Sequence, residues 1–206
     1  TSGSTGRPKG VTHSHATAFA FVDWCSEAFR PTERDRFSSH APFHFDLSIL
    51  DLYVPLKHGA SVVLIDSEAG KQPGTLAGVI AERGITIWYS TPSILRMLVE
   101  YGNLENHDFS ALRIVNFAGE VFASKHLRAL MERWPAPEYF NLYGPTETNV
   151  CTYYKLRAPL PESQMTPLPI GRKCSEDDTR VVDSGGTDVE RGEQGELIVG
   201  GGSVML

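Results

Sequence analysis

Two stretches of this chain combine glycine with polar and charged side chains whose types suit ligand binding. The first stretch, Thr1 to Gly10, reads TSGSTGRPKG. Glycine lets a backbone approach a ligand closely, and successive N–H groups with hydroxyls and a lysine form a nest for a phosphate chain. The order of residues differs from that of the Walker loop. On composition alone a flexible N-terminal linker is the simpler interpretation, although a linker does not require the Arg-Pro-Lys-Gly ending.

The second stretch, Asn141 to Glu147, reads NLYGPTE and places an amide, an aromatic ring, a hydroxyl and a carboxylate within seven residues. A nucleotide site needs a flat face for the base, a polar group at its edge and a carboxylate for magnesium, which prefers oxygen ligands. The alternative is a turn at the end of a strand, with Tyr143 packed in the core and Glu147 in solvent.

A third candidate feature is a single residue, Asp46, whose carboxylate could bind a charged group of a substrate. It lies in the segment FHFDLS, at 43–48, just before an apolar stretch at 49–56 that predicts a buried helix. Aspartate is a common helix N-cap, and the residues alone favour that role. The functional alternative is that its carboxylate anchors the ammonium group of a substrate.

The remaining sequence alternates between helical and strand patterns. This alternation predicts βαβ units, that is, an α/β fold with a mostly parallel sheet flanked by helices. Ligands of such sheets bind beyond the carboxyl ends of the strands, where 118–120 and 143–148 are expected. Helices are expected at 13–30, 49–56, 75–83, 94–101 and 125–133, and strands at 36–43, 61–65, 85–90, 112–117 and 138–142.

The pattern changes after Cys151, where helical periodicity is lost and proline and glycine recur. Strands are expected at 152–156 and 179–183, with a last one inside 192–200. We therefore predict an α/β core over residues 1–151 and a truncated β-rich subdomain over 152–206.

Composition narrows the class of protein. The 206 residues are 41% hydrophobic, enough for a buried core. A net charge of −6 argues against nucleic-acid binding. No apolar run approaches the roughly 20 residues of a membrane span, and no secretory leader is recognisable. Three widely spaced cysteines, at 25, 151 and 174, favour a reducing, cytoplasmic location over a disulfide framework or a zinc site.

Together, TSGSTGRPKGV at the N-terminus and YGPTE at 143–147 closely resemble the motifs of the adenylate-forming (ANL) superfamily: acyl-CoA synthetases, luciferases and the adenylation domains of non-ribosomal peptide synthetases. The resemblance spans almost the whole chain. It implies that a substrate carboxylate attacks the α-phosphorus of ATP, giving an acyl-adenylate and pyrophosphate, with Mg²⁺ as the metal. Such chemistry depends on positioning and charge neutralisation more than on a protein nucleophile.

The resemblance also implies roles for individual residues. The adenine site is expected to contain the stacking ring of Tyr143 together with Gly119, Glu120 and Asn141. The pyrophosphate side is expected to be Ser2, Gly3, Ser4, Thr5, Gly6 and Lys9. Thr146 matches the hydroxyl that contacts phosphate and Glu147 the magnesium ligand, and these two residues with Lys9 form the expected catalytic set.

The segment Phe45-Asp-Leu-Ser48 resembles the F-D-x-S signature of amino-acid-activating domains, in which the aspartate pairs with the α-ammonium of the substrate. An amino-acid anchor thereby becomes the better interpretation of Asp46. By this resemblance the pocket is lined by Asp46, Leu47, Leu50, Tyr89, Asn116, Ala118, Leu142, Val150 and Cys151. Such a compact, weakly polar pocket favours a small apolar amino acid, and the set looks most like that of L-proline-activating domains. The implied acceptor is the thiol of a phosphopantetheinylated peptidyl carrier protein.

The chain departs from the superfamily pattern at its ends. It begins at the phosphate loop and stops shortly after the GELIVGG segment at 195–201. The strand before the loop, the aspartate that holds the ATP ribose and the small C-terminal domain with its catalytic lysine are missing. We therefore expect this piece alone to be inactive and to bind ATP poorly. Two alternatives stay open: an aryl- or acyl-CoA ligase of the same superfamily, and a non-catalytic ATP-binding module.

Overall fold

A seven-stranded mixed sheet organises the computed structural model, which describes residues 10–175 and 177–206. In this part of the chain the strand order is β2-β1-β3-β4-β5-β6-β7. Strands β1 to β5 run parallel to one another, whereas β6 is antiparallel to β5 and β7 is antiparallel to β6. The strands are β1 Arg36–Ser39, β2 Ser61–Leu64, β3 Ile87–Ser90, β4 Ile114–Phe117, β5 Glu138–Tyr143, β6 Thr152–Arg157 and β7 Arg172–Lys173.

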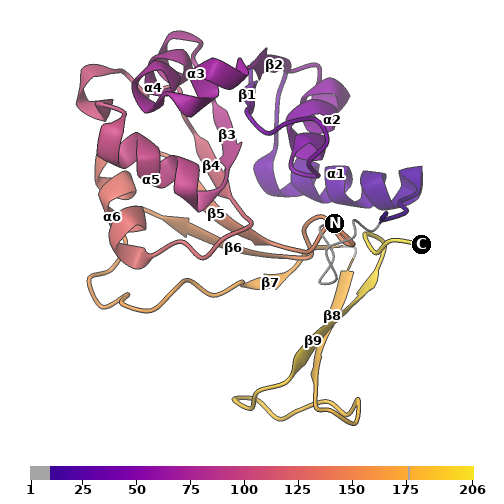
Figure 1. Cartoon of the computed structure of the whole chain (residues 1–206). Coiled ribbons are helices and arrows are strands. Elements are labelled where there is room, and N and C mark those ends of the chain that lie inside the picture. Colours follow the sequence, from indigo (N-terminus) through magenta and orange to yellow (C-terminus); the bar gives the residue numbers. More distant parts are fainter. Residues whose placement is uncertain (1–9, 176) are drawn as a thin grey trace.

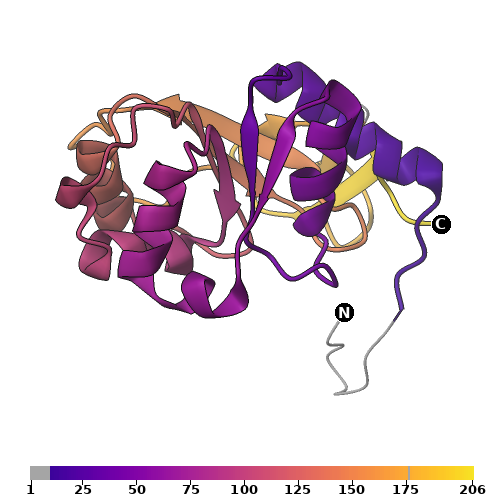
Figure 2. The same cartoon turned by 90° about the horizontal axis from the view of Figure 1, so that it is seen from above.

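Helices cover both faces of this sheet (Figures 1 and 2). On one face, α1 (His15–Phe29) and α2 (Ser48–His58) bury apolar residues against β3, β4 and β5. The opposite face carries the second core cluster, with α4 (Pro73–Glu82), α5 (Pro92–Tyr101) and α6 (Ser124–Arg133). Two short helices, α3 (Ser67–Lys71) and the 3₁₀ turn Leu104–Asn106, lie in the connections.

The central strands β3 and β4 are buried at all four positions. Strands of a parallel sheet that is covered on both sides read as continuous apolar runs for this reason. Alternate residues serve the two cores: Ile87 and Tyr89 pack with α1 and α2, whereas Trp88 packs with the helices of the other face. The expected α/β fold with a mostly parallel sheet is confirmed.

Local sequence signals explain where several helices begin. Ser14 caps α1, and its hydroxyl accepts a hydrogen bond from the N–H of Thr17, whose own hydroxyl accepts from the N–H of Ser14, which is a capping box. Proline at 73 and at 92 opens α4 and α5, where its missing N–H costs nothing. Gly59, with φ of +65°, ends α2 in the left-handed conformation.

The N-cap role considered for Asp46 is wrong. Helix α2 begins at Ser48, and Leu47 occupies the N-cap position without a capping hydrogen bond from its side chain. Instead, the hydroxyl of Ser48 donates to the carbonyl oxygens of Phe43 and Phe45, at 3.2 and 2.7 Å. This arrangement releases the Asp46 carboxylate from a structural task. The strand expected at 36–43 also ends earlier, at Ser39.

After residue 151 the chain continues in β-structure. Strands β6 and β7 extend the main sheet, and β8 (Asp177–Val182) pairs with β9 (Glu196–Gly201) in a separate antiparallel hairpin. The hairpin projects from the edge of the molecule (Figure 1). The division into units at residue 151 stays a prediction, since β6 and β7 lie beyond it and still pair with the main sheet.

Candidate functional site

A cavity of about 290 Å³ lies beyond the carboxyl ends of β4 and β5. These strands are parallel neighbours, with Phe117 in register with Asn141, so the segments that follow them meet at one edge of the sheet. The cavity is lined by all four residues assigned to the adenine site, Gly119, Glu120, Asn141 and Tyr143. The Tyr143 side chain is 43% exposed rather than packed in the core. It therefore offers an open aromatic face, as the second motif requires.

Polar contacts hold the rim of this cavity. The Asn141 amide donates to the carbonyl oxygen of Pro169 at 2.9 Å. The Glu120 carboxylate accepts hydrogen bonds from the N–H of Ser93, at 3.2 Å, and from its hydroxyl. Glu120 is thereby tied to the start of α5, and the base of a nucleotide would meet fixed polar groups at its edge.

Gly144 follows Tyr143 because the turn leaves no room for a side chain. A Cβ atom built there would lie 2.2 Å from the carbonyl oxygen of Asn149. The turn is closed by a hydrogen bond from the N–H of Thr148 to the carbonyl oxygen of Pro145, at 3.0 Å. The glycine thus permits the close approach of two backbone segments that aim the following Thr146 and Glu147.

Replacing Gly144 with alanine is expected to lower the free energy of unfolding by roughly 1–3 kcal/mol, because the backbone must shift to avoid the contact. Thermal unfolding of the chain, followed by circular dichroism, measures this loss. Gly78→Ala in α4 is the control: its Cβ would meet an atom of His107 at 3.7 Å, an ordinary contact, and alanine stabilises a helix interior by about 0.5–1 kcal/mol. Equal melting temperatures of Gly144→Ala and the unsubstituted chain would contradict the steric argument.

A second cavity, of about 250 Å³, is lined by the residues assigned to the amino-acid anchor and to the phosphate contact. Asp46 and Thr146 both line it. The Asn149 side-chain amide donates to the backbone carbonyl oxygen of Asp46 at 3.2 Å and so joins the two loops. Glu147, next in the turn, is half-buried, and its carbonyl oxygen accepts from the N–H of Met205 at 2.8 Å. The structure thus brings together the residues assigned to substrate ammonium, phosphate and magnesium.

The other residues of the expected amino-acid pocket lie in the core between the sheet and helices α1 and α2. Leu50, Tyr89, Ala118, Leu142 and Val150 belong to one buried cluster, and Leu47 packs against it. Asn116 and Cys151 are fully buried. The structure therefore places these residues together, but the cavity beside Asp46 is not lined by them.

This core also contains two buried polar side chains, those of Tyr89 and Asn116. Tyr89 and Asn116 are adjacent in register on β3 and β4. Burial, followed by the charges of Asp51 and Asp46, raises the pKa of the Tyr89 phenol and keeps it neutral. Neither atom of the Asn116 amide has a hydrogen-bond partner within residues 10–175 and 177–206. A buried amide without a partner is costly, so this position is where a polar group of a ligand or a water molecule would be accepted.

The phosphate-loop residues Ser2, Gly3, Ser4, Thr5, Gly6 and Lys9 lie outside the described residues. Their expected roles stay predictions. Of that stretch the structure describes only Gly10, which precedes the entry into α1.

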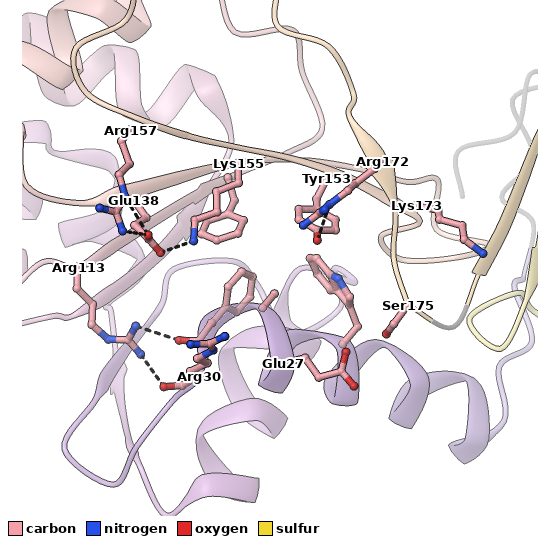
Figure 3. A pocket seen from close by; sticks show the side chains of 14 residues that line it. Glu27, Arg30, Arg113, Glu138, Tyr153, Lys155, Arg157, Arg172, Lys173 and Ser175 are labelled. Atoms are coloured by element: carbon pink, nitrogen blue, oxygen red, sulfur yellow. Dashed lines mark hydrogen bonds and ion pairs between the residues drawn. The ribbon is translucent and has the colours of Figure 1, made fainter.

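A larger groove, of about 710 Å³, lies between α1 and strands β5 to β7 (Figure 3). Its lining is rich in arginine and lysine, but Lys155 and Arg157 share the carboxylate of Glu138, and Arg172 donates to the hydroxyl of Tyr153 at 2.8 Å. The groove has no lining residue in common with the two cavities described above and contains none of the expected site residues.

Sequence patterns did not single out His13 as a site residue. It lines the cavity beside Asp46, and its ring contacts the carbonyl oxygen of Thr146. The two residues are 133 positions apart, and no local motif links them. Only the signal of the phosphate loop, which His13 follows closely, points to this region.

Comparison with known proteins identifies the family of this chain. The family model described as "AMP-binding enzyme" matches residues 1–206. The chain therefore belongs to the AMP-binding enzyme family. This agrees with the resemblance to adenylate-forming proteins seen in the motifs.

Several relatives with curated names are carrier-protein ligases. The chain is 45% identical over 206 residues to an L-proline--[L-prolyl-carrier protein] ligase of Pseudomonas fluorescens, covering 100% of the chain and 41% of the relative. It is 46% identical over 203 residues to a ligase of the same name from Streptomyces coelicolor, covering 98% and 38%. A D-alanine--D-alanyl carrier protein ligase of Staphylococcus epidermidis is 33% identical over 207 residues, with coverage of 100% and 40%. The chain thus spans about two fifths of the length of these relatives.

Solved structures give the same result for the fold. The crystal structure of IdnL1 superimposes with a TM-score of 0.88 at 27% identity, over 95% of this chain and 40% of that one. For the crystal structure of CmiS6 the TM-score is 0.89 at 29% identity, with coverage of 97% and 48%. Among the residues that the structure describes, no helix has the length and apolarity needed to cross a membrane.

Proposed function

We propose that the full-length protein containing this chain activates a small apolar amino acid, L-proline first among them, as its adenylate and transfers it to the thiol of a phosphopantetheinylated carrier protein. The observation that carries the proposal is the cavity beyond β4 and β5, lined by Gly119, Glu120, Asn141 and Tyr143. The cavity with Asp46 and Thr146 supplies the substrate side. Similarity to L-proline--[L-prolyl-carrier protein] ligases supports the choice of amino acid.

The residues present fit ATP and magnesium. The exposed ring of Tyr143 offers a face for adenine, and the polar rim offers hydrogen-bonding groups for its edge. Within the described residues, no group of three or more His, Cys, Asp or Glu side chains is arranged to hold a metal by itself. Magnesium commonly binds through one or two carboxylates together with substrate phosphates, and Glu147 would supply one such carboxylate.

In the proposed reaction, an oxygen of the amino-acid carboxylate bonds to the α-phosphorus of ATP and the bond to pyrophosphate breaks. ATP supplies the adenylyl group, and Mg²⁺ offsets the charge of the phosphates when bound. The Asp46 carboxylate pairs with the substrate ammonium and thereby orients the substrate carboxylate toward Thr146, which lines the same cavity. The Thr146 hydroxyl and Lys9 bind phosphate oxygens. Positioning of this kind can account for much of the acceleration of such a reaction.

The carrier-protein acceptor and the cytoplasmic location are further parts of the proposal. Transfer would form a thioester between the aminoacyl group and the carrier thiol, with AMP as the leaving group. Cys25, Cys151 and Cys174 are all free and buried, which fits a reducing compartment.

Exchange of ATP with labelled pyrophosphate by the full-length protein tests the proposal. L-proline is expected to give the highest amino-acid-dependent exchange, compared with L-valine, D-alanine and a blank without amino acid. Pockets distinguish single methylene groups by only about 10–200-fold, so some exchange with L-valine is compatible with the proposal. Exchange with L-proline no higher than the blank would contradict it.

A further inference from the structure

One imidazole joins the start of α1 to the turn that carries Thr146 and Glu147. His13 Nε2 lies 2.9 Å from the carbonyl oxygen of Thr146. A carbonyl oxygen accepts hydrogen bonds only, so Nε2 must carry the hydrogen in this contact. The contact therefore defines one end of the ring as a donor to the turn.

The other end of the ring is held by the helix cap. Nδ1 lies 3.0 Å from the hydroxyl oxygen of Thr17, which belongs to the capping box with Ser14. The single hydrogen of the Thr17 hydroxyl goes either to Nδ1 or to the carbonyl oxygen of Ser14, which lies 2.9 Å away; in the second case Nδ1 carries a hydrogen and donates to the hydroxyl oxygen. The donor to Thr146 is kept in either case. The ring is thus oriented by a buried threonine on a regular helix.

Neighbouring backbone contacts bring the same segments together. The N–H of Leu206 donates to the carbonyl oxygen of Thr12 at 2.9 Å. The N–H of Met205 donates to the carbonyl oxygen of Glu147 at 2.8 Å. The segment that leads from the phosphate loop into α1 therefore lies beside the turn with Thr146 and Glu147. His13, Thr146 and Asp46 also line one cavity.

We propose that His13 is a positioning residue for the adenylation step. Its Nε2–H holds the Thr146 carbonyl and thereby aims the Thr146 hydroxyl at phosphate and the Glu147 carboxylate at magnesium. The inference rests on the proposed function, since it assigns His13 a task within that site. A displacement of about 1 Å in a catalytic group can cost on the order of 100-fold in rate, so loss of one tether to a turn has a measurable effect.

The test compares His13→Ala with His13→Gln in the full-length protein, by ATP–pyrophosphate exchange at saturating and limiting substrates. His13→Ala is expected to lower kcat roughly 10-fold, with the KM for the amino acid nearly unchanged because Asp46 keeps its place. His13→Gln carries an N–H donor of similar reach and is expected to restore most of kcat. Thr12→Ala is the matched control, because it changes an exposed neighbouring side chain and leaves the backbone contact with Leu206.

Three results would overturn the inference. Exchange by His13→Ala equal to that of the unsubstituted protein would show that the tether is not needed. An equal loss in His13→Gln and His13→Ala, with equally lowered melting temperatures, would show that the ring only stabilises the fold. A rise in the KM for the amino acid without a change in kcat would place His13 on the substrate side. In contrast, no amino-acid-dependent exchange in the unsubstituted protein would refute the proposed function itself, and this inference with it.

Discussion

Replacing Asp46 with alanine in the full-length protein is expected to lower amino-acid-dependent ATP–pyrophosphate exchange by roughly 100-fold or more. Asp46 is half-buried on a cavity, and its backbone is held by the Asn149 amide. Removing one partner of a desolvated charge pair costs about 2–5 kcal/mol, and about 1.4 kcal/mol corresponds to a factor of ten. Most of the loss should appear as a higher KM for the amino acid, because the ammonium contact is made already in the bound substrate.

The control for this prediction is Asp66→Ala. Asp66 is an exposed aspartate that caps α3 and lies outside both cavities, so exchange should stay within about twofold of the unsubstituted protein, since surface changes of this kind alter stability only slightly. Undiminished exchange in Asp46→Ala would contradict the amino-acid anchor. It would favour an aryl- or acyl-acid substrate, whose recognition does not need a partner for an ammonium group.

Replacing Asp35 with alanine is expected to destabilise the chain by roughly 2–3 kcal/mol, because the buried carboxylate is lost as an acceptor while the Arg113 guanidinium, 38% exposed, can still bind water. Asp35 is 4% exposed. Its carboxylate accepts two hydrogen bonds from the Arg113 guanidinium, at 2.7 and 2.8 Å, one from the Thr86 hydroxyl at 2.7 Å and one from the N–H of Thr32 at 2.8 Å. The guanidinium also donates to the carbonyl oxygen of Phe29, at the end of α1, at 3.0 Å.

This cluster joins the end of α1 and the starts of β1, β3 and β4, the elements that support the site, so its loss should loosen them together. Thermal unfolding of Asp35→Ala measures the effect. Asp188→Ala is the control, because the ion pair of Asp188 with Arg180 is exposed on both sides and such pairs contribute only about 0–1 kcal/mol. Similar melting temperatures for the two variants would contradict the importance assigned to Asp35.

The same cluster predicts a dependence of stability on pH. Burial alone would raise the pKa of Asp35, but hydrogen bonds from Arg113 and Thr86 outweigh it and lower the pKa from 3.8 to about 2. Because the folded pKa lies below the unfolded one, the contribution to stability is present above pH 4 and is lost as the pH falls from about 4 to 2. It amounts to about 2 kcal/mol. The difference in unfolding free energy between the unsubstituted chain and Asp35→Asn should therefore shrink below pH 4, and a constant difference from pH 5 to pH 2 would contradict this.

The sequence by itself determined the class of fold and the edge of the sheet at which the candidate site lies. Periodicity and proline or glycine at element ends are local signals, and they predicted the alternation that the structure shows. Because parallel neighbours present their carboxyl ends at one edge, the stretches at 118–120 and 143–148 were expected to lie close together. The cavity lined by Glu120 and Tyr143 confirms this placement. Family membership likewise follows from motifs that are continuous in the chain.

Only the tertiary structure decided which side chains become partners when the two residues are far apart in the sequence. Asp46 looked like a helix cap, but Ser48 bonds the preceding carbonyl groups and leaves the carboxylate free. Asp35 and Arg113 are 78 residues apart, and His13 and Thr146 are 133 apart. Such pairs depend on strand register and helix placement, which arise from packing of the whole core. A single sequence records local propensities directly, whereas these partners become visible only when the sheet has brought them together.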